Sequence, residues 1–226
     1  MLVRYWMSTP AIAIDADATP QAAANLMRQH DISFLPVMED RILAGIATDS
    51  DLKRAAASPN HKLKPHEHEE LLKTLQVREI MSPHPITIHA DLTMEEAAEI
   101  LLVNKISGLP VTDTTGKLMG VITKSDIFRV IISLTGVGKR GIQFAFQALD
   151  RPGCIRDITD TIRTYGGRVS SILSSYERVP EGYRRLFIRV VDIDRPSLGR
   201  LKEVLAGKAT LLYMVDHREK RREIYG

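Results

Sequence analysis

The chain has 226 residues, a net charge of +3 and one cysteine, Cys154. A single cysteine excludes an internal disulfide, which fits a reducing compartment and disfavours a thiolate metal site. The N-terminus lacks the charged and apolar regions of a signal peptide, and no apolar run is long enough to cross a bilayer, so we expect a cytoplasmic protein with no membrane partner.

The charge is unevenly distributed along the chain. Residues 1–135 carry 13 Lys and Arg against 17 Asp and Glu, whereas residues 136–226 carry 18 against 11. This difference predicts two domains that meet near Gly136. The basic half could face an anionic partner, although a solvated surface is the simpler interpretation.

The first half of the chain contains an internal repeat. Three blocks return in the same order, at an offset of 74 residues and then, after one inserted residue, of 75. They are residues 3–8 and 77–82, Leu35-Pro36-Val37 and Leu109-Pro110-Val111, and residues 45–51 and 120–126. Because chance does not produce such an ordered series, we predict two copies of one structural unit.

Each copy predicts the same order of elements, β-α-β-β-α. The first copy gives a strand at 11–15, a helix at 22–29, a strand from Leu35, a turn at 39–41, a strand at 42–47 and a helix from Ser50. The second copy gives a strand at 85–89, a helix at 95–104 and a hairpin turn at 113–116. Thr19 and Thr93 stand where helix N-caps belong.

Both copies end their last strand on the pattern Gly-x-x-Thr-x-Ser-Asp. The glycine lets backbone approach closely, and the threonine stands where free N–H groups at a helix start favour a phosphate. The aspartate can accept hydrogen bonds from ribose hydroxyls. The alternative is that these side chains only cap helices: Thr48, Asp51, Thr123 and Asp126.

Residues 3–132 resemble a CBS pair, also called a Bateman module, because the family's Gly-h-x-Thr-x-x-Asp signature and its h-Pro-Val element each occur twice. The resemblance implies that AMP, ADP, ATP or S-adenosylmethionine binds as a regulatory ligand and that no cofactor is required. The nucleotide-binding residues that it implies are Ala13, Leu35, Pro36, Thr48 and Asp51 in the first motif, and Thr87, Lys105, Leu109, Pro110, Thr123, Lys124 and Asp126 in the second.

The two implied sites differ in charge. The second motif has Lys105 and Lys124 where the first has Asp31 and Asp49. Lysine attracts a phosphate and aspartate repels it. We therefore predict that the second-motif site binds anions better, and that the first is empty or takes an uncharged adenosine moiety.

A connector at 58–76 separates the copies and carries three histidines among Lys and Glu. His66 and His68, with Glu67 and Glu70, could hold a metal. Residues two apart on a helix do not face each other, however. We predict a solvated linker that becomes helical from about Glu67, without a metal site.

The last third of the chain predicts a different order, β-α-β-β-α-β. The elements are strands at 141–150, 169–179, 185–193 and 209–215 and helices at 154–165 and 196–205. This is the ferredoxin-like arrangement, so the whole chain belongs to the α/β (α+β) class. The basic residues 217–226 are expected to form a frayed tail.

Residues 140–216, with the turn Asp150-Arg151-Pro152-Gly153, resemble an ACT domain. The resemblance implies that these four residues bind a small regulator, with backbone N–H groups near Gly153 offered to a carboxylate. Arg168 replaces the asparagine that is frequent in amino-acid-binding members, so a purely dimerising ACT domain stays open.

The order of the two domains resembles the AcuB-type acetoin-utilisation proteins, and both resemblances imply a homodimer. We divide the chain into CBS motif 1 at 1–57, the connector at 58–76, CBS motif 2 at 77–135, a linker at 136–139, the ACT-like domain at 140–216 and the basic tail at 217–226.

These features predict a regulatory, ligand-sensing protein that acts on an unidentified protein partner. An enzyme is not expected, because the sequence has no phosphate loop, nucleophile elbow or paired metal-ligand motif. Two alternatives are a dimerising interaction protein with degenerate sites, and nucleic-acid binding by the basic half. Dispersed arginines and few aromatic residues disfavour the second alternative.

Overall fold

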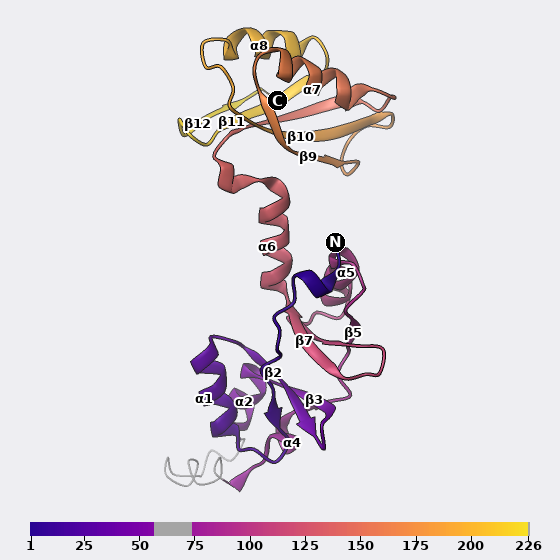
Figure 1. The fold of residues 1–226 in the computed structure, drawn as a ribbon, viewed down its shortest axis with the longest axis vertical. Coiled ribbons are helices and arrows are strands. Elements are labelled where there is room, and N and C mark those ends of the chain that lie inside the picture. Colours follow the sequence, from indigo (N-terminus) through magenta and orange to yellow (C-terminus); the bar gives the residue numbers. More distant parts are fainter. Residues whose placement is uncertain (57–73, 226) are drawn as a thin grey trace. The chain divides into compact units, whose positions relative to one another are not determined.

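The computed structural model describes residues 1–56 and 74–225 (Figure 1). Contacts divide the chain into two compact units, Met1–Phe128 and Arg129–Gly226, and the division falls inside helix α6 (Lys124–Thr135) rather than at Gly136. The connector histidines that were weighed as metal ligands, His66 and His68, lie outside the described part, so the prediction of a linker without a metal site stays a prediction. Among the described residues, no helix combines the length and apolar character that a membrane crossing needs.

The first unit contains the predicted β-α-β-β-α order twice. The first copy consists of β1 (Ile14–Asp15), α1 (Pro20–His30), β2 (Phe34–Glu39), β3 (Ile42–Thr48) and α2 (Asp49–Ala56). The second consists of β5 (Ile88–His89), α5 (Met94–Val103), β6 (Gly108–Thr112), β7 (Leu118–Thr123) and α6. The opening strands are two residues long, shorter than predicted.

The predicted N-caps are confirmed. The Thr19 hydroxyl accepts a hydrogen bond from the backbone N–H of Ala22 at 3.2 Å. The Thr93 hydroxyl accepts one from Glu96 at 3.2 Å, and the Glu96 carboxylate accepts the Thr93 backbone N–H at 2.7 Å. This reciprocal capping box satisfies two helix-end groups that would otherwise lack partners.

The segment in front of each copy packs on the other copy. The turn η1 (Val3–Tyr5) donates a backbone hydrogen bond from Val3 to Leu92 at 2.8 Å, and Ser8 pairs with Val121. Helix α4 (Val77–Ile80) likewise donates from Val77 to Ala18 at 2.8 Å, and β4 (Ser82–Pro83) pairs with β3. Each copy thus covers a strand edge that the other would leave unpaired.

The motif glycines make this exchange possible. A Cβ at Gly45 would lie 2.8 Å from the carbonyl oxygen of Ser82, and one at Gly120 would lie 2.6 Å from that of Ser8. Close backbone approach is what the sequence predicts for these glycines. The approaching backbone belongs to the other copy of the repeat.

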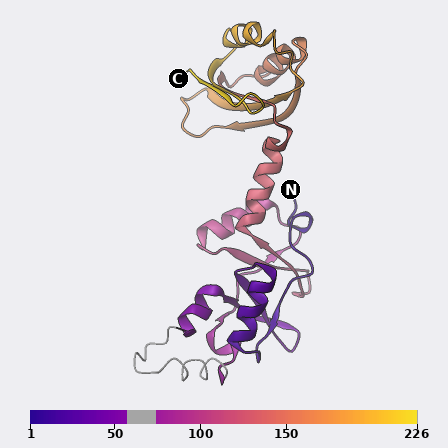
Figure 2. The same ribbon diagram turned by 90° about the vertical axis from the view of Figure 1, so that its left-hand side faces the viewer.

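The second unit is a five-stranded antiparallel sheet with α7 and α8 on one face (Figures 1 and 2). Its elements are η2 (Val137–Lys139), β8 (Ile142–Leu149), α7 (Cys154–Thr164), β9 (Arg168–Ser175), β10 (Tyr183–Val191), α8 (Leu198–Ala206), β11 (Thr210–Asp216) and β12 (Arg221–Ile224). The strand order is β12-β11-β8-β10-β9, in which β8 to β11 have the predicted ferredoxin-like topology.

The core of this unit lies between the sheet and the two helices. Phe144 and Phe146 of β8 stack with ring centroids 6.1 Å apart, and they belong to the same buried cluster as Ile158 and Ile162 of α7 and Leu205 of α8. The alternating apolar residues of β8 face the helices, which is why its periodicity was readable from the sequence.

The expectation of a frayed tail at 217–226 is wrong for residues 221–224. These residues form β12, which pairs antiparallel with β11. The Glu223 carboxylate accepts a hydrogen bond from the Lys202 ammonium group of α8 at 2.7 Å. This contact raises the pKa of Lys202 and lowers the pKa of Glu223. A run of charged residues carries no strand periodicity, so tertiary pairing alone creates this strand.

His217 is expected to make the second unit acid-sensitive. Its Nε2 atom is shielded from solvent and has no hydrogen-bond partner in the described chain. Burial, aided by the charges of Arg189 and Arg222, lowers the pKa of His217 from its ordinary value. A histidine with a lowered folded-state pKa contributes stability that is present above its unfolded pKa and lost as the pH falls.

We expect faster hydrogen exchange in β8 to β11 at pH 5 than at pH 7, once exchange is corrected for its intrinsic pH dependence. A His217→Gln variant should lose the part of this change that arises between pH 7 and 5. The matched control is His89→Gln in the first unit. An unchanged pH profile in His217→Gln would show that the imidazole does not cause it.

Candidate functional site

A cleft of about 500 Å³ in the first unit is lined by both copies of the repeat. The first copy contributes the start of β2, the end of β3 and the start of α2, and the second contributes the segment before β5 and the segment between α5 and β6. The lining residues are Ser33, Phe34, Ile46, Thr48, Asp49, Ser50, Ser82, Pro83, His84, Pro85, Ile86, Lys105, Ile106, Ser107 and Gly108.

The motif threonine and aspartate form a helix cap in both copies. The Asp51 carboxylate accepts hydrogen bonds from the Thr48 hydroxyl at 2.6 Å and from its backbone N–H at 2.9 Å, and the Asp51 N–H donates back to the Thr48 hydroxyl at 3.2 Å. Thr123 and Asp126 repeat this geometry at 2.6, 2.9 and 3.3 Å. These side chains therefore cap the starts of α2 and α6, and whether they also bind a ligand stays a prediction.

The predicted cradle of free N–H groups is largely occupied by the protein itself. The N–H groups of Thr48 and Asp51 are used in the cap, and that of Asp49 donates to the Ser33 carbonyl at 3.0 Å. In the second copy Lys124 donates to the Ser107 carbonyl at 3.0 Å. An anion in the cleft must therefore rely on side-chain charge more than on the helix start.

Lys105 supplies such a charge, but in the first-motif cleft. It lies in the left-handed region (φ 55°) just after α5, and it lines the cleft together with Thr48 and Asp49. No ion pair of Lys105 is found among the described residues, whereas Asp49 is paired with Lys53 at 2.5 Å. The cleft that the sequence ranked as the poorer anion site thus contains a cation that makes no ion pair in the described part of the chain.

The predicted ranking of the two sites is therefore wrong in its assignment of Lys105. By the repeat offset, Asp31 occupies the corresponding place after α1 and is also left-handed (φ 52°). The segment between α5 and β6, which carries Lys105, packs on the start of β2, where a Cβ added at Gly108 would lie 2.3 Å from the Phe34 ring. This packing between the copies is the physical reason that Lys105 lines the first-motif cleft.

Several predicted residues lie away from this cleft. Leu35, Pro36, Leu109 and Pro110 are buried within β2 and β6, and Phe34 and Gly108, one residue earlier, line the cleft instead. Ala13 and Thr87 precede the opening strands without lining it. The equivalent place in the second copy is occupied by Thr123, Lys124 and Asp126. Asp51 does not line the cleft itself but holds the hydroxyl of Thr48, which does.

Sequence reasoning missed the apolar wall of the cleft. Ile86 is 42% exposed there, and the Phe34 ring lies where a Gly108 side chain would otherwise stand, 2.3 Å from an added Cβ. Position 34 aligns with position 108 in the repeat, and a phenylalanine aligned with a glycine was the sequence feature that could have indicated this wall.

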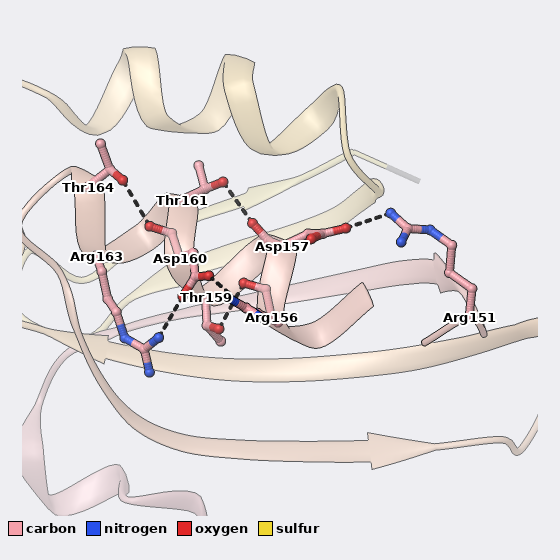
Figure 3. Close-up of polar contacts among 8 residues, drawn as sticks. All are labelled: Arg151, Arg156, Asp157, Thr159, Asp160, Thr161, Arg163 and Thr164. Atoms are coloured by element: carbon pink, nitrogen blue, oxygen red, sulfur yellow. Dashed lines mark hydrogen bonds and ion pairs between the residues drawn. The ribbon is translucent and has the colours of Figure 1, made fainter. Parts of the chain in front are cut away.

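A second concavity, of about 780 Å³, lies at the start of α7 in the second unit. All four predicted residues line it: Asp150, Arg151, Pro152 and Gly153. Arg156, Arg163 and Arg184 line it as well, which gives it a strongly basic wall. Figure 3 shows how neighbouring acids hold three of the arginines, with Arg151 on Asp157 at 2.6 Å and with Arg163 and Arg156 on Asp160 at 2.7 and 3.4 Å.

Comparison with known proteins gives consistent results for the first unit. The model of the family described as "CBS domain" matches residues 3–58 and 77–133. A CBS domain-containing protein of Dictyostelium discoideum is 35% identical over 59% of this chain and 93% of its own length. An inosine-5′-monophosphate dehydrogenase of Korarchaeum cryptofilum is 36% identical, but only 21% of its length is covered.

One similar solved structure is a CBS domain pair in complex with 5′-methylthioadenosine and S-adenosyl-L-methionine. It is 28% identical with a TM-score of 0.50, and the match covers 59% of this chain and 97% of that one. These matches cover a little over half of the chain.

Proposed function

Because this chain belongs to the CBS domain family, we propose that it is a regulatory sensor that binds an adenosine-bearing ligand in the cleft lined by Thr48, Ile86 and Lys105. The observation that carries the proposal is the composition of this cleft. It joins an apolar wall, which suits a flat base, to the ammonium group of Lys105, which makes no ion pair among the described residues and suits a phosphate. The similar CBS pair that holds 5′-methylthioadenosine and S-adenosyl-L-methionine supports this ligand class.

The charge of the cleft favours AMP, ADP or ATP over S-adenosylmethionine. Lys105 attracts phosphate and repels a sulfonium cation, while the opposing Asp49 is neutralised by Lys53. Phosphate charge should therefore matter more to affinity than adenosine alone. The ligand is a regulator in this proposal, and no residue of the cleft is assigned a catalytic role.

Calorimetric titration with AMP, ATP, S-adenosylmethionine and uncharged 5′-methylthioadenosine tests the proposal. Lys105→Gln should weaken AMP and ATP by about tenfold, the effect of losing roughly one charge-assisted contact, and should leave 5′-methylthioadenosine unchanged. Ile86→Glu should weaken all four. Ile42→Glu is the matched control, because Ile42 is 70% exposed on β3 outside the cleft.

Absence of binding by any of the four ligands would leave the CBS pair with a structural role and favour the dimerising alternative. Binding that Ile86→Glu does not weaken would place the ligand elsewhere. Asp126→Asn tests the second motif without removing its helix cap, because the asparagine side-chain oxygen can still accept the Thr123 N–H.

For the second unit we propose an ACT-like regulatory role, with a small carboxylate ligand at the basic concavity near Gly153. Support comes from the ferredoxin-like topology and from the four predicted residues that line one concavity. A dimerising role, in an AcuB-type homodimer that acts on a protein partner, is the competing proposal. Amino-acid titration and the oligomeric state in solution distinguish the two.

A further inference from the structure

We propose a second anion site in the C-terminal unit, for a small dianion that carries a phosphate or two carboxylates. The site is a pocket of about 330 Å³ at the opposite end of β8 from the Gly153 turn. It lies between the segment that leaves η2, the end of β10 and the turn that follows β11. It is independent of the adenosine cleft and of the Gly153 concavity.

The lining of this pocket has a large excess of positive charge. Lys139, Arg140, Arg195 and Arg218 line it, and Asp192 is its single acidic residue. Guanidinium groups match the oxygens of phosphate and carboxylate in a two-pronged geometry. Cations that share one small pocket without ion pairs repel one another, and an anion between them would relieve this repulsion.

The two acidic residues near the pocket, Asp192 and Asp216, are already paired with Arg168 and Arg195. The Arg168 guanidinium donates twice to Asp192, at 2.8 and 3.0 Å. Arg195 is bound to the buried Asp216. Among the described residues, the side chains of Lys139, Arg140 and Arg218 make no ion pair. Three cations thus border the pocket without an ion pair of their own, because the acid in the lining, Asp192, is paired with Arg168.

The floor of the pocket is apolar and rigid. Ile142, Val190 and Val191 are 1, 0 and 8% exposed. Gly141 brings β8 against β10 so closely that a Cβ would lie 2.1 Å from the Val190 carbonyl oxygen. Such a floor, with cations at the rim, suits a compact molecule with charged ends, and a bound dianion would fix residues 139–140 to the end of the sheet.

The test is titration of the full, ¹⁵N-labelled chain with inorganic phosphate and, separately, with succinate, at constant ionic strength. We expect amide shift changes in residues 139–142 and 190–193. Arg140→Gln/Arg218→Gln should weaken the better ligand by at least about tenfold, since two charge-assisted contacts are lost. Arg200→Gln/Lys208→Gln removes the same charge from exposed positions outside the pocket and should leave the affinity unchanged.

The stronger of the two probes identifies the ligand as a phosphate compound or a dicarboxylate. The proposal is overturned if neither probe shifts these amides, if shifts occur only near Gly153, or if both double variants lose affinity equally. Loss of adenosine binding in Ile86→Glu does not bear on this site, so failure of one proposal leaves the other intact.

Discussion

Replacing Gly120 with alanine is expected to destabilise the Met1–Phe128 unit by about 3 kcal/mol, the upper end of the usual range for an overpacked interior. The new Cβ would lie 2.6 Å from the Ser8 carbonyl oxygen. That carbonyl accepts a hydrogen bond from Val121 at 3.0 Å, and the Ser8 N–H donates to the Val121 carbonyl at 2.9 Å. Backbone that withdraws from the methyl group must break both bonds.

The same reasoning extends to Gly45→Ala, where the added Cβ would lie 2.8 Å from the Ser82 carbonyl oxygen and 2.5 Å from the Met81 sulfur. Urea unfolding followed by fluorescence of the single tryptophan, Trp6, reports on this unit. Gly199→Ala is the matched control. It lies in α8 of the other unit, where an added Cβ would meet no atom of a packed neighbour within 4 Å, so it should leave the Trp6 transition unchanged.

A loss of less than about 0.5 kcal/mol in Gly120→Ala, the range of an ordinary surface substitution, would contradict the close crossing of the two copies. It would mean that residues 3–8 do not pack on the second copy as described. The cleft is lined by Ser82 and Pro83 of the other exchanged segment, so it is the corresponding result for Gly45→Ala that would remove part of its structural basis.

Arg195→Ala is expected to destabilise the second unit by about 3 kcal/mol, the lower end of the range for breaking a buried ion pair. Asp216 is 2% exposed, and its carboxylate would lose its guanidinium partner. Two backbone donors would remain, the N–H groups of Arg218 at 2.9 Å and Glu219 at 3.1 Å. They limit the cost, because they keep the buried carboxylate partly satisfied.

The matched control for this prediction is Arg200→Ala. Arg200 pairs with Glu203 at 3.0 Å, but both side chains are about 70% exposed, so the loss should stay below about 0.5 kcal/mol. Hydrogen exchange of β8 to β11 measures both effects. Asp216→Asn should partly restore Arg195→Ala, since it removes the unpaired charge. Equal effects of the two arginine variants would show that burial does not strengthen this pair.

Most local structure of this chain was predictable, because it depends on short-range patterns. Thr19 and Thr93 begin helices where their capping side chains predict it. The alternation of β8 and the Gly153 turn placed the ferredoxin-like elements within a few residues. Asp150 to Gly153 are contiguous in sequence, so their convergence on one concavity needed no long-range information.

Residues that meet across the repeat were predicted less well. Lys105 was assigned to the second motif because it lies in the second copy, yet it lines the cleft of Thr48 and Asp49. Leu35 and Leu109 were placed in the sites because they belong to the motif, yet both are fully buried in the core. The pattern identifies which residues recur and does not say which copy each segment packs on.

The sequence by itself determined the repeat, the order of elements in both units and the motif residues, since helix caps, turns and hydrophobic periodicity are local. Only the tertiary structure decided that residues 3–8 and 77–83 exchange between copies, that the caps use the N–H groups expected to bind phosphate, and that 221–224 form a strand. The hydrophobic pattern of residues 3–8 and 77–83 is equally compatible with packing on their own copy and with packing on the other copy. The choice between them depends on backbone contacts such as that of Gly120 with Ser8, which arise only when the chain closes on itself.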